Sequence, residues 1–418
     1  MKKILYFTVV LFLFFSCSGN SKNDAKNTNQ TVDNDVVESV TTKQEIELLP
    51  LPKDSILKNI TFNNFSYTVY IPQNTDIKNA DILLVFDPHA SGLLPVEKYQ
   101  KLASENNIVL IASNNSENSL PSNQYQEILS NITDFTGKHF RKNTISALGF
   151  SGGGKVASLL LENTKLDNII TAGAGLSKEI MQQKIVLPKY LSFVGKYDFN
   201  YPGLFYQQKQ FKENALNTFL YVFNGKHEWP DSRFMQYAFY MIKLSALKKQ
   251  GKNRQIRDLT SKIKSELYPA GKEKDILIKK QKLDLLVFLL DEYTDVSSFK
   301  NELDEIISSD SYKLKMKELN AMFQKENTLK QNYAQAISAK DVDWWKSEIE
   351  NLNKKAKTKN IDAEIYTRLI NYLSLVCYMY VDNSLKNNYK GQARHFLEIY
   401  KIIDPENPDV QKFQKQLQ

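Results

Sequence analysis

The sequence predicts an α/β fold, with a doubly wound, mostly parallel sheet that is followed by an all-α helical domain. Three observations carry this prediction. Short apolar runs alternate with helical segments as far as about residue 231. Beyond it, strand-like runs vanish and helical periodicity continues to the end. Between the two halves of the sheet region, a Gly-x-Ser-x-Gly turn joins an apolar run to a helical one.

Residues 80–86 form a continuous apolar run that is typical of a central parallel strand, whereas 65–72 alternates like an early strand. Helices are expected at about 95–106 and 123–139. The other predicted strands are 108–112, 145–148, 169–174, 190–194 and 219–223. This spacing indicates a sheet domain over residues 55–250.

The helical domain is expected over residues 251–418, with helical periodicity in 276–293, 311–339, 344–356 and 363–381. The segment 391–408 resembles the end of a tetratricopeptide repeat, in which a small residue packs in the second helix and a proline closes it. One or two degenerate repeats are therefore a possibility that the pattern leaves open. Four aromatic residues are expected to form helix-packing core: Trp344, Trp345, Phe396 and Tyr400.

The amino terminus predicts a secretion signal. Two lysines precede an apolar stretch from Ile4 to Phe15, which is too short to span a bilayer comfortably and ends close to Cys17. The pattern resembles a bacterial lipoprotein signal over residues 1–16, with lipidation of the Cys17 thiol and a palmitate-type membrane anchor in the cell envelope. An ordinary signal peptide and an uncleaved anchor are the alternatives. The sequence does not indicate which face of which membrane would carry the anchor. Residues 17–54 are predicted to be a disordered tether.

The formal charge of +8 is spread over lysine-rich helices that also carry Asp and Glu, which indicates a solvated surface rather than a nucleic-acid site. Only two cysteines are present, and Cys377 lies in an apolar helical run, so no disulfide is expected. The sequence contains neither a metal-binding cluster nor a phosphate-binding loop, and we expect no cofactor and no metal.

The turn Gly149-Phe150-Ser151-Gly152-Gly153 has the context of a nucleophile elbow, a strand before and a helix after. In such a turn the serine takes a strained backbone conformation, and the flanking glycines allow close approach. A glycine-rich turn with a bystander serine is the alternative, and the pentapeptide alone does not exclude it.

A serine nucleophile needs a base, and His227 follows the last predicted strand directly. Asp198, after the strand 190–194, is the candidate for the carboxylate that orients the base. Individually, Asp198 could cap a turn and His227 could be a surface residue. The order Ser151, Asp198, His227, each at the carboxyl end of a strand, favours a catalytic triad.

An oxyanion hole needs two amides. Gly152 at the start of the helix is one candidate donor. The second is expected from the loop after residue 86, where Pro88 has no N–H, so that His89 or Ala90 would supply it. His89 could equally be a rim residue that contacts substrate.

Three motifs, together with Asp198 between the last two, give residues 55–245 a resemblance to α/β-hydrolases of the dienelactone-hydrolase or polyhydroxybutyrate-depolymerase-like esterase type. The motifs are Phe86-Asp87-Pro88-His89, Gly149-Phe150-Ser151-Gly152-Gly153 and Gly225-Lys226-His227-Glu228-Trp229-Pro230. The resemblance implies hydrolysis of a small-molecule ester or acyl substrate through an acyl-enzyme. A serine peptidase on the same fold and a non-catalytic, lipid-anchored binding protein are the alternatives. The helical region is expected to bind a protein partner or to restrict the substrate, or merely to cover apolar surface.

Overall fold

The structure is a computed structural model that describes residues 49–183, 186–268, 273–358, 360 and 362–418. The predicted signal segment 1–16, Cys17 and the tether as far as residue 48 lie outside the described residues. Within the described part of the chain, no helix combines the length and the apolar character that crossing a bilayer requires.

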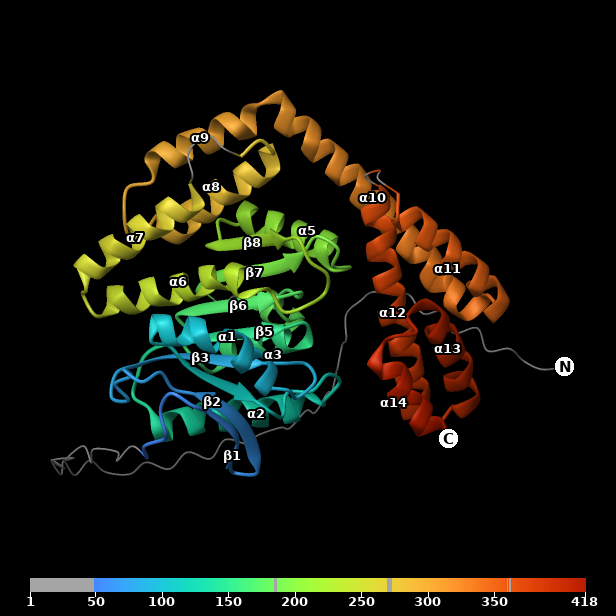
Figure 1. Ribbon diagram of the computed structural model, residues 1–418, viewed down its shortest axis with the longest axis horizontal. Helices are drawn as coiled ribbons and strands as arrows, with labels where there is room; N and C mark the ends of the chain where they lie inside the picture. Colours follow the sequence, from blue (N-terminus) through green and yellow to red (C-terminus); the bar gives the residue numbers. More distant parts are fainter. Residues whose placement is uncertain (1–48, 184–185, 269–272, 359, 361) are drawn as a thin grey trace, which may run out of the picture.

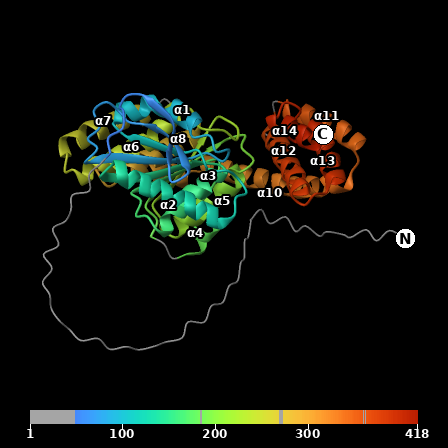
Figure 2. The ribbon, with the colours of Figure 1, turned by 90° about the horizontal axis from the view of Figure 1, so that it is seen from below.

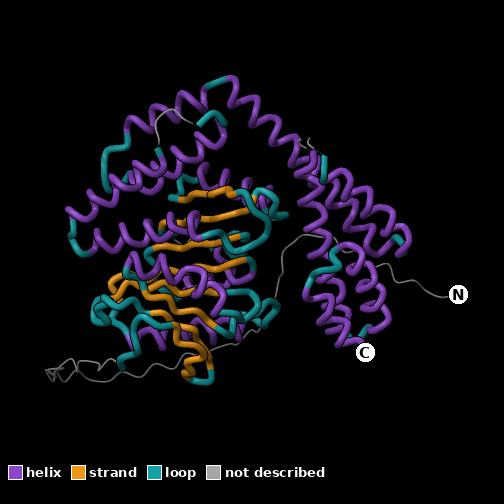
Figure 3. The backbone as a smooth tube through the Cα atoms, in the orientation of Figure 1, coloured by secondary structure: helices purple, strands orange, loops and turns teal. Residues whose placement is uncertain are grey.

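An eight-stranded sheet with the order β1-β2-β4-β3-β5-β6-β7-β8 forms the first part of the molecule (Figure 3). The pairs β1–β2 and β2–β4 are antiparallel, and every other pair is parallel. The strands are β1 (Ile56–Phe62), β2 (Phe65–Tyr70), β3 (Ala80–Phe86), β4 (Val109–Ser113), β5 (Lys142–Phe150), β6 (Asn168–Ala172), β7 (Lys189–Gly195) and β8 (Thr218–Phe223). The predicted fold class, a mostly parallel sheet of the α/β-hydrolase type followed by helices, is confirmed.

Helices cover both faces of this sheet, which explains why β3, β4, β6 and β7 are buried along their whole length. On one face, α1 (Leu93–Asn106) and α6 (Ser232–Lys249) pack on the sheet. On the other face lie α2 (Ser122–His139) and α3 (Gly152–Leu159), which continues into the short η1 (Leu160–Glu162). Two further helices, α4 (Lys178–Gln182) and α5 (Tyr201–Glu213), lie beside β6, β7 and β8.

Strand β1 was not expected from the sequence. It pairs with β2 through a hairpin whose turn residues Asn63 and Asn64 both have a left-handed backbone, with φ of 47° and 66°. Two consecutive positive φ values favour the turn that matches the twist of a hairpin, and asparagine tolerates this conformation better than most residues. Asn59, with φ of 55°, lies where the β1 register shifts.

The helices after α6 form one continuous path away from the sheet and back towards it. Figure 1 shows α8 (Ile276–Leu290) beside β8, with α7 (Asn253–Leu267) towards α6 and α9 (Ser297–Ser308) on the far side of α8. The long α10 (Asp310–Ala339) then crosses to a separate bundle. The bundle contains α11 (Val342–Ala356), α12 (Asp362–Lys386), α13 (Lys390–Ile403) and α14 (Pro408–Leu417). Seen from below in Figure 2, α10 links the sheet region to the bundle.

The helical half contributes to several cores, and some of them are shared with the sheet region: Met322 and Phe323 of α10, for example, belong to a buried cluster with Val194 of β7 and Leu220 of β8. Ile256, Ile263 and Leu267 of α7 and the apolar face of α8 belong to the same buried cluster as the sheet and α6, so this core continues past the predicted boundary at residue 250. The bundle has its own core, in which Trp345 and Tyr400 are fully buried. The boundary itself and the tetratricopeptide-like character of 391–408 stay predictions.

Candidate active site

Ser151 lies in a sharp turn between β5 and α3, with φ of 50° and ψ of −123°. This conformation is strained for any residue with a side chain. The turn is possible only because its neighbours are glycines. A Cβ on Gly149 would lie 2.1 Å from the Gly153 carbonyl oxygen, and one on Gly153 would lie 2.2 Å from the Phe86 carbonyl oxygen. Side chains there are excluded by backbone atoms, and the turn has the geometry expected of a nucleophile elbow.

The side chains of Ser151, His227 and Asp198 form a hydrogen-bonded chain. The Ser151 Oγ lies 2.9 Å from His227 Nε2, and His227 Nδ1 lies 2.9 Å from Asp198 Oδ2. Asp198 follows β7 and His227 follows β8, so both reach Ser151 from the carboxyl edge of the sheet. In Figure 1 the ends of β6 and β7 point towards the side on which the bundle α11–α14 lies.

The His227 ring lies close to two phenylalanine rings, with centroids 4.8 Å away for Phe150 and 4.6 Å away for Phe199. Asp198 is fully buried, and its other oxygen, Oδ1, accepts a hydrogen bond of 2.8 Å from the Asn200 amide. One-fifth of the His227 side chain is exposed. The imidazole is therefore fixed in orientation while it remains accessible to a substrate.

The loop after β3 is organised by the buried carboxylate of Asp87. It accepts hydrogen bonds of 2.9 Å from the His89 amide and from the Trp229 indole N–H. Burial alone would raise the pKa of this carboxyl, but interactions with the His89 side chain, the Trp229 indole and the His89 amide hold its pKa below the usual range. The Ala90 amide donates to the Ser116 carbonyl oxygen at 2.9 Å. An oxyanion would thus have to compete with an internal acceptor for either predicted first-loop amide, and their donor role stays a prediction.

The His89 imidazole itself lies at the surface, with about two-thirds of its side chain exposed. Its Nδ1 is 3.5 Å from Asp87, and this contact raises the pKa of His89 despite the opposing effect of burial. This position is compatible with the rim residue that the sequence left open as an alternative.

Sequence reasoning did not single out Asn118, which lies in the loop between β4 and α2. Its Oδ1 is 1.8 Å from the position that a Cβ on Gly152 would occupy, so its side-chain amide rests directly on the residue after Ser151. The Asn118 backbone amide donates to the Pro88 carbonyl oxygen at 2.9 Å, which ties the two loops together. An asparagine in a polar loop carries no distinguishing sequence pattern, so only the tertiary structure identifies it.

The remaining chemically notable side chains lie elsewhere. His139 Nδ1 is 2.6 Å from the Leu49 carbonyl oxygen, at the end of α2. Cys377 is a buried free cysteine on α12, and burial raises the pKa of its thiol. Among the residues described, no group of three or more His, Cys, Asp or Glu side chains could hold a metal ion.

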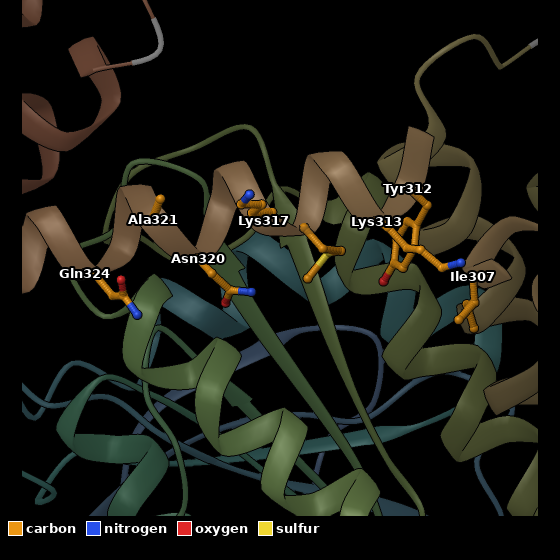
Figure 4. Close-up of a pocket in the computed structure, with 8 residues that line it drawn as sticks. Ile307, Tyr312, Lys313, Lys317, Asn320, Ala321 and Gln324 are labelled. Atoms are coloured by element: carbon orange, nitrogen blue, oxygen red, sulfur yellow. The ribbon is translucent and has the colours of Figure 1, made fainter. Parts of the chain in front are cut away.

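A pocket of about 660 Å³ lies along α10 (Figure 4). Its lining residues come from the end of α9 and the first half of α10: Ile307, Tyr312, Lys313, Met316, Lys317, Asn320, Ala321 and Gln324. None of the predicted site residues belongs to this lining, and the candidate active site is therefore a different feature of the molecule.

The sheet and the Ser151 turn define an α/β-hydrolase fold with a serine at its elbow. No family model matches the sequence, and neither does any curated protein. The chain is similar to the solved structure of S-formylglutathione hydrolase from Staphylococcus aureus, at 14% identity over 43% of this chain and 92% of that chain, with a TM-score of 0.36. Est1E from Butyrivibrio proteoclasticus is 15% identical over 47% of this chain and 99% of its own, with a TM-score of 0.35. An esterase from Rhizomucor miehei is 13% identical over 49% of this chain and 86% of its own, with a TM-score of 0.37.

Proposed function

We propose that this protein is a serine hydrolase that cleaves carboxylic esters through a covalent acyl-enzyme. In this proposal Ser151 is the nucleophile, His227 the general base, and Asp198 the carboxylate that orients the imidazole. The observation that carries it is the pair of 2.9 Å contacts that link the three side chains, with the serine on a strained elbow.

Each residue has a definite task in the proposed reaction. As Ser151 Oγ attacks the ester carbonyl carbon, its proton passes to His227 Nε2, and the carbonyl oxygen becomes an oxyanion near the first amide of α3. His227 then returns the proton to the leaving alkoxide, and the C–O bond of the ester breaks. A water molecule, deprotonated by the same imidazole, attacks the acyl-enzyme and releases the acid and Ser151.

The side chain of Asn118 is proposed as an oxyanion donor beside Gly152, because the His89 and Ala90 amides already have acceptors. The role requires the amide group to flip, so that Nδ2, which donates, takes the place next to Gly152 that Oδ1 occupies in the structure. We expect Asn118→Ala to lower kcat roughly 10²-fold, the usual effect of removing one such donor, with little change in KM. The matched control is Glu117→Gln, an exposed neighbour in the same loop. A kcat for Asn118→Ala within twofold of the control would contradict this proposal and favour a backbone amide of the first loop as the second oxyanion donor.

The bond that is cleaved can be identified with a panel of short acyl esters and aminoacyl amides, assayed on the full chain. Hydrolysis of the esters with negligible amide turnover supports the proposal. Preferential cleavage of the aminoacyl amides would instead identify a serine peptidase. If neither class is hydrolysed and a fluorophosphonate leaves the protein unlabelled, the non-catalytic binding protein is the correct interpretation.

We further propose that the protein is anchored in the bacterial cell envelope through a lipid on Cys17. The support is the short apolar stretch that ends next to this cysteine. Intact-mass spectrometry of the mature protein is expected to show the mass of the acyl chains, and Cys17→Ser to abolish it and leave an unprocessed or soluble form. A mature wild-type protein without lipid would contradict the proposal.

A further inference from the structure

The loop from Lys196 to Asn200, which carries Asp198, is bound from two sides. On the sheet side, the Lys196 amide donates to the Phe223 carbonyl oxygen at 2.7 Å, and the Tyr197 amide donates to the Gly225 carbonyl oxygen at 2.9 Å. These bonds connect the loop to the end of β8 and to the turn before His227. Because these bonds use the amide N–H groups of the loop, they do not involve its carbonyl oxygens.

Three of these carbonyl groups are bound by side chains of the helical region. Arg368 Nη1 donates to the Lys196 oxygen at 2.8 Å, and Asn371 Nδ2 donates to the Tyr197 oxygen at 3.2 Å, both from α12. Lys330 Nζ of α10 donates to the Phe199 oxygen at 2.7 Å. The donors are 131 to 174 residues away in the sequence, so the helical region reaches the loop only through the tertiary fold.

A buried ion cluster fixes the direction of these donors. The Arg368 guanidinium and the Glu326 carboxylate are both fully buried and lie 2.8 Å apart, and Lys330 Nζ is 2.7 Å from the same carboxylate. Burial lowers the pKa of Lys330, although Glu326 opposes this effect. Buried ion pairs contribute little net stability, and we infer that this one serves instead to favour a single arrangement of α10 and α12. In this arrangement the Lys330 ammonium and the Arg368 guanidinium both donate hydrogen bonds to the loop.

Phe199 extends this contact to the imidazole. Its ring packs against the apolar core of the bundle and also lies 4.6 Å, centroid to centroid, from the His227 ring. Since Lys330 holds the Phe199 carbonyl oxygen, the same short loop transmits the position of the helices to both Asp198 and His227. On the sheet side, the Phe150 ring lies 4.8 Å from the imidazole, centroid to centroid.

We propose that Lys330, Arg368 and Asn371 are positioning residues of the active site: through the 196–200 loop, helices α10 and α12 set the placement of Asp198 and His227 relative to Ser151. The proposal rests on the hydrolase function above. The helical region is then part of the catalytic apparatus without contacting the reacting atoms. A displacement of about 1 Å in such a constellation is enough to lower a rate about 10²-fold.

The test uses the full chain and the variants Lys330→Met and Asn371→Leu, which remove one donor each at nearly constant volume. Lys330→Met leaves Glu326 paired with Arg368, so a folded protein is expected. We expect kcat to fall ten- to hundredfold in both variants, with KM nearly unchanged. The conservative Lys330→Arg, which keeps a donor, is expected to retain most of the wild-type kcat. The matched control is Ser374→Ala, which removes a 2.6 Å hydrogen bond from Ser374 to Asp404 within the bundle, three residues beyond Asn371.

Hydrogen exchange provides a readout that is independent of activity. In Lys330→Met and Asn371→Leu, the amides of residues 196–201 are expected to exchange faster than in wild type, whereas Ser374→Ala leaves them unchanged. If exchange and kcat in both variants match those of Ser374→Ala, the helices merely cover apolar surface and the proposal is overturned. If the wild-type protein hydrolyses no ester but the amides of residues 196–201 still exchange faster in both variants, the proposed hydrolase function is wrong. The helices would then still be shown to fix the 196–200 loop.

Discussion

Replacing Ser151 by alanine is expected to abolish labelling by a fluorophosphonate and to lower kcat on the best ester substrate by about 10⁴-fold or more. The physical reason is that the substitution removes the only atom that would form the bond to the acyl group. His227→Ala and Asp198→Asn are expected to cost a similar factor, because the three residues act as one unit. Gel-based labelling and initial rates measure both effects.

The fold is expected to survive Ser151→Ala, since the Ser151 side chain is only half-buried and the substitution removes a hydrogen bond to His227, whose imidazole keeps its bond to Asp198. Circular dichroism and the unfolding midpoint check this point. Ser122→Ala, at an exposed serine that begins α2, is the matched control and is expected to keep full labelling. Labelling that persists in Ser151→Ala at another serine would refute the assignment of the nucleophile.

Much of the sheet was predictable because its central strands are buried on both faces, which requires uninterrupted apolar runs. Strand β3 is the clearest case, since the predicted 80–86 and the observed Ala80–Phe86 coincide. Strand β1 escaped prediction for the opposite reason. It is an edge strand that is partly exposed, and a register shift near Asn59 interrupts its alternation.

Some residues of the candidate site could likewise be predicted from the sequence, and others could not. The elbow at Ser151 is a local motif, because the glycines that permit its backbone lie within two residues of the serine. His227 and Asp198 could be selected because parallel strands bring their carboxyl ends to one edge. The contacts of Asn118 with Gly152 and of Arg368 with the 196–200 loop depend on which loops and helices meet in three dimensions, and no local pattern encodes them.

A chain that ends at Gln250 is expected to lose its fold, although all three proposed triad residues precede that point. Seven fully or nearly buried apolar side chains of α7 and α8 pack into the core that the sheet shares with α6: Ile256, Ile263, Leu267, Leu285, Leu286, Leu289 and Leu290. Burial of one such side chain contributes about 1.5–3 kcal/mol, so their removal costs roughly 10–20 kcal/mol of gross stabilisation. The net stability of a typical domain is only about 5–15 kcal/mol.

The control for this truncation is a chain that ends at Ser308, which keeps α7, α8 and α9 but lacks α10 and the bundle. Because it retains the shared core, we expect it to stay soluble and folded by circular dichroism, while the loss of Lys330 and Arg368 slows its fluorophosphonate labelling. The chain that ends at Gln250 is expected to aggregate and to show no labelling. If that shorter chain instead remains soluble and hydrolyses small esters at nearly the wild-type rate, the helical region is a separable module. The contacts of α7 and α8 with the sheet would then contribute nothing that the catalytic domain requires.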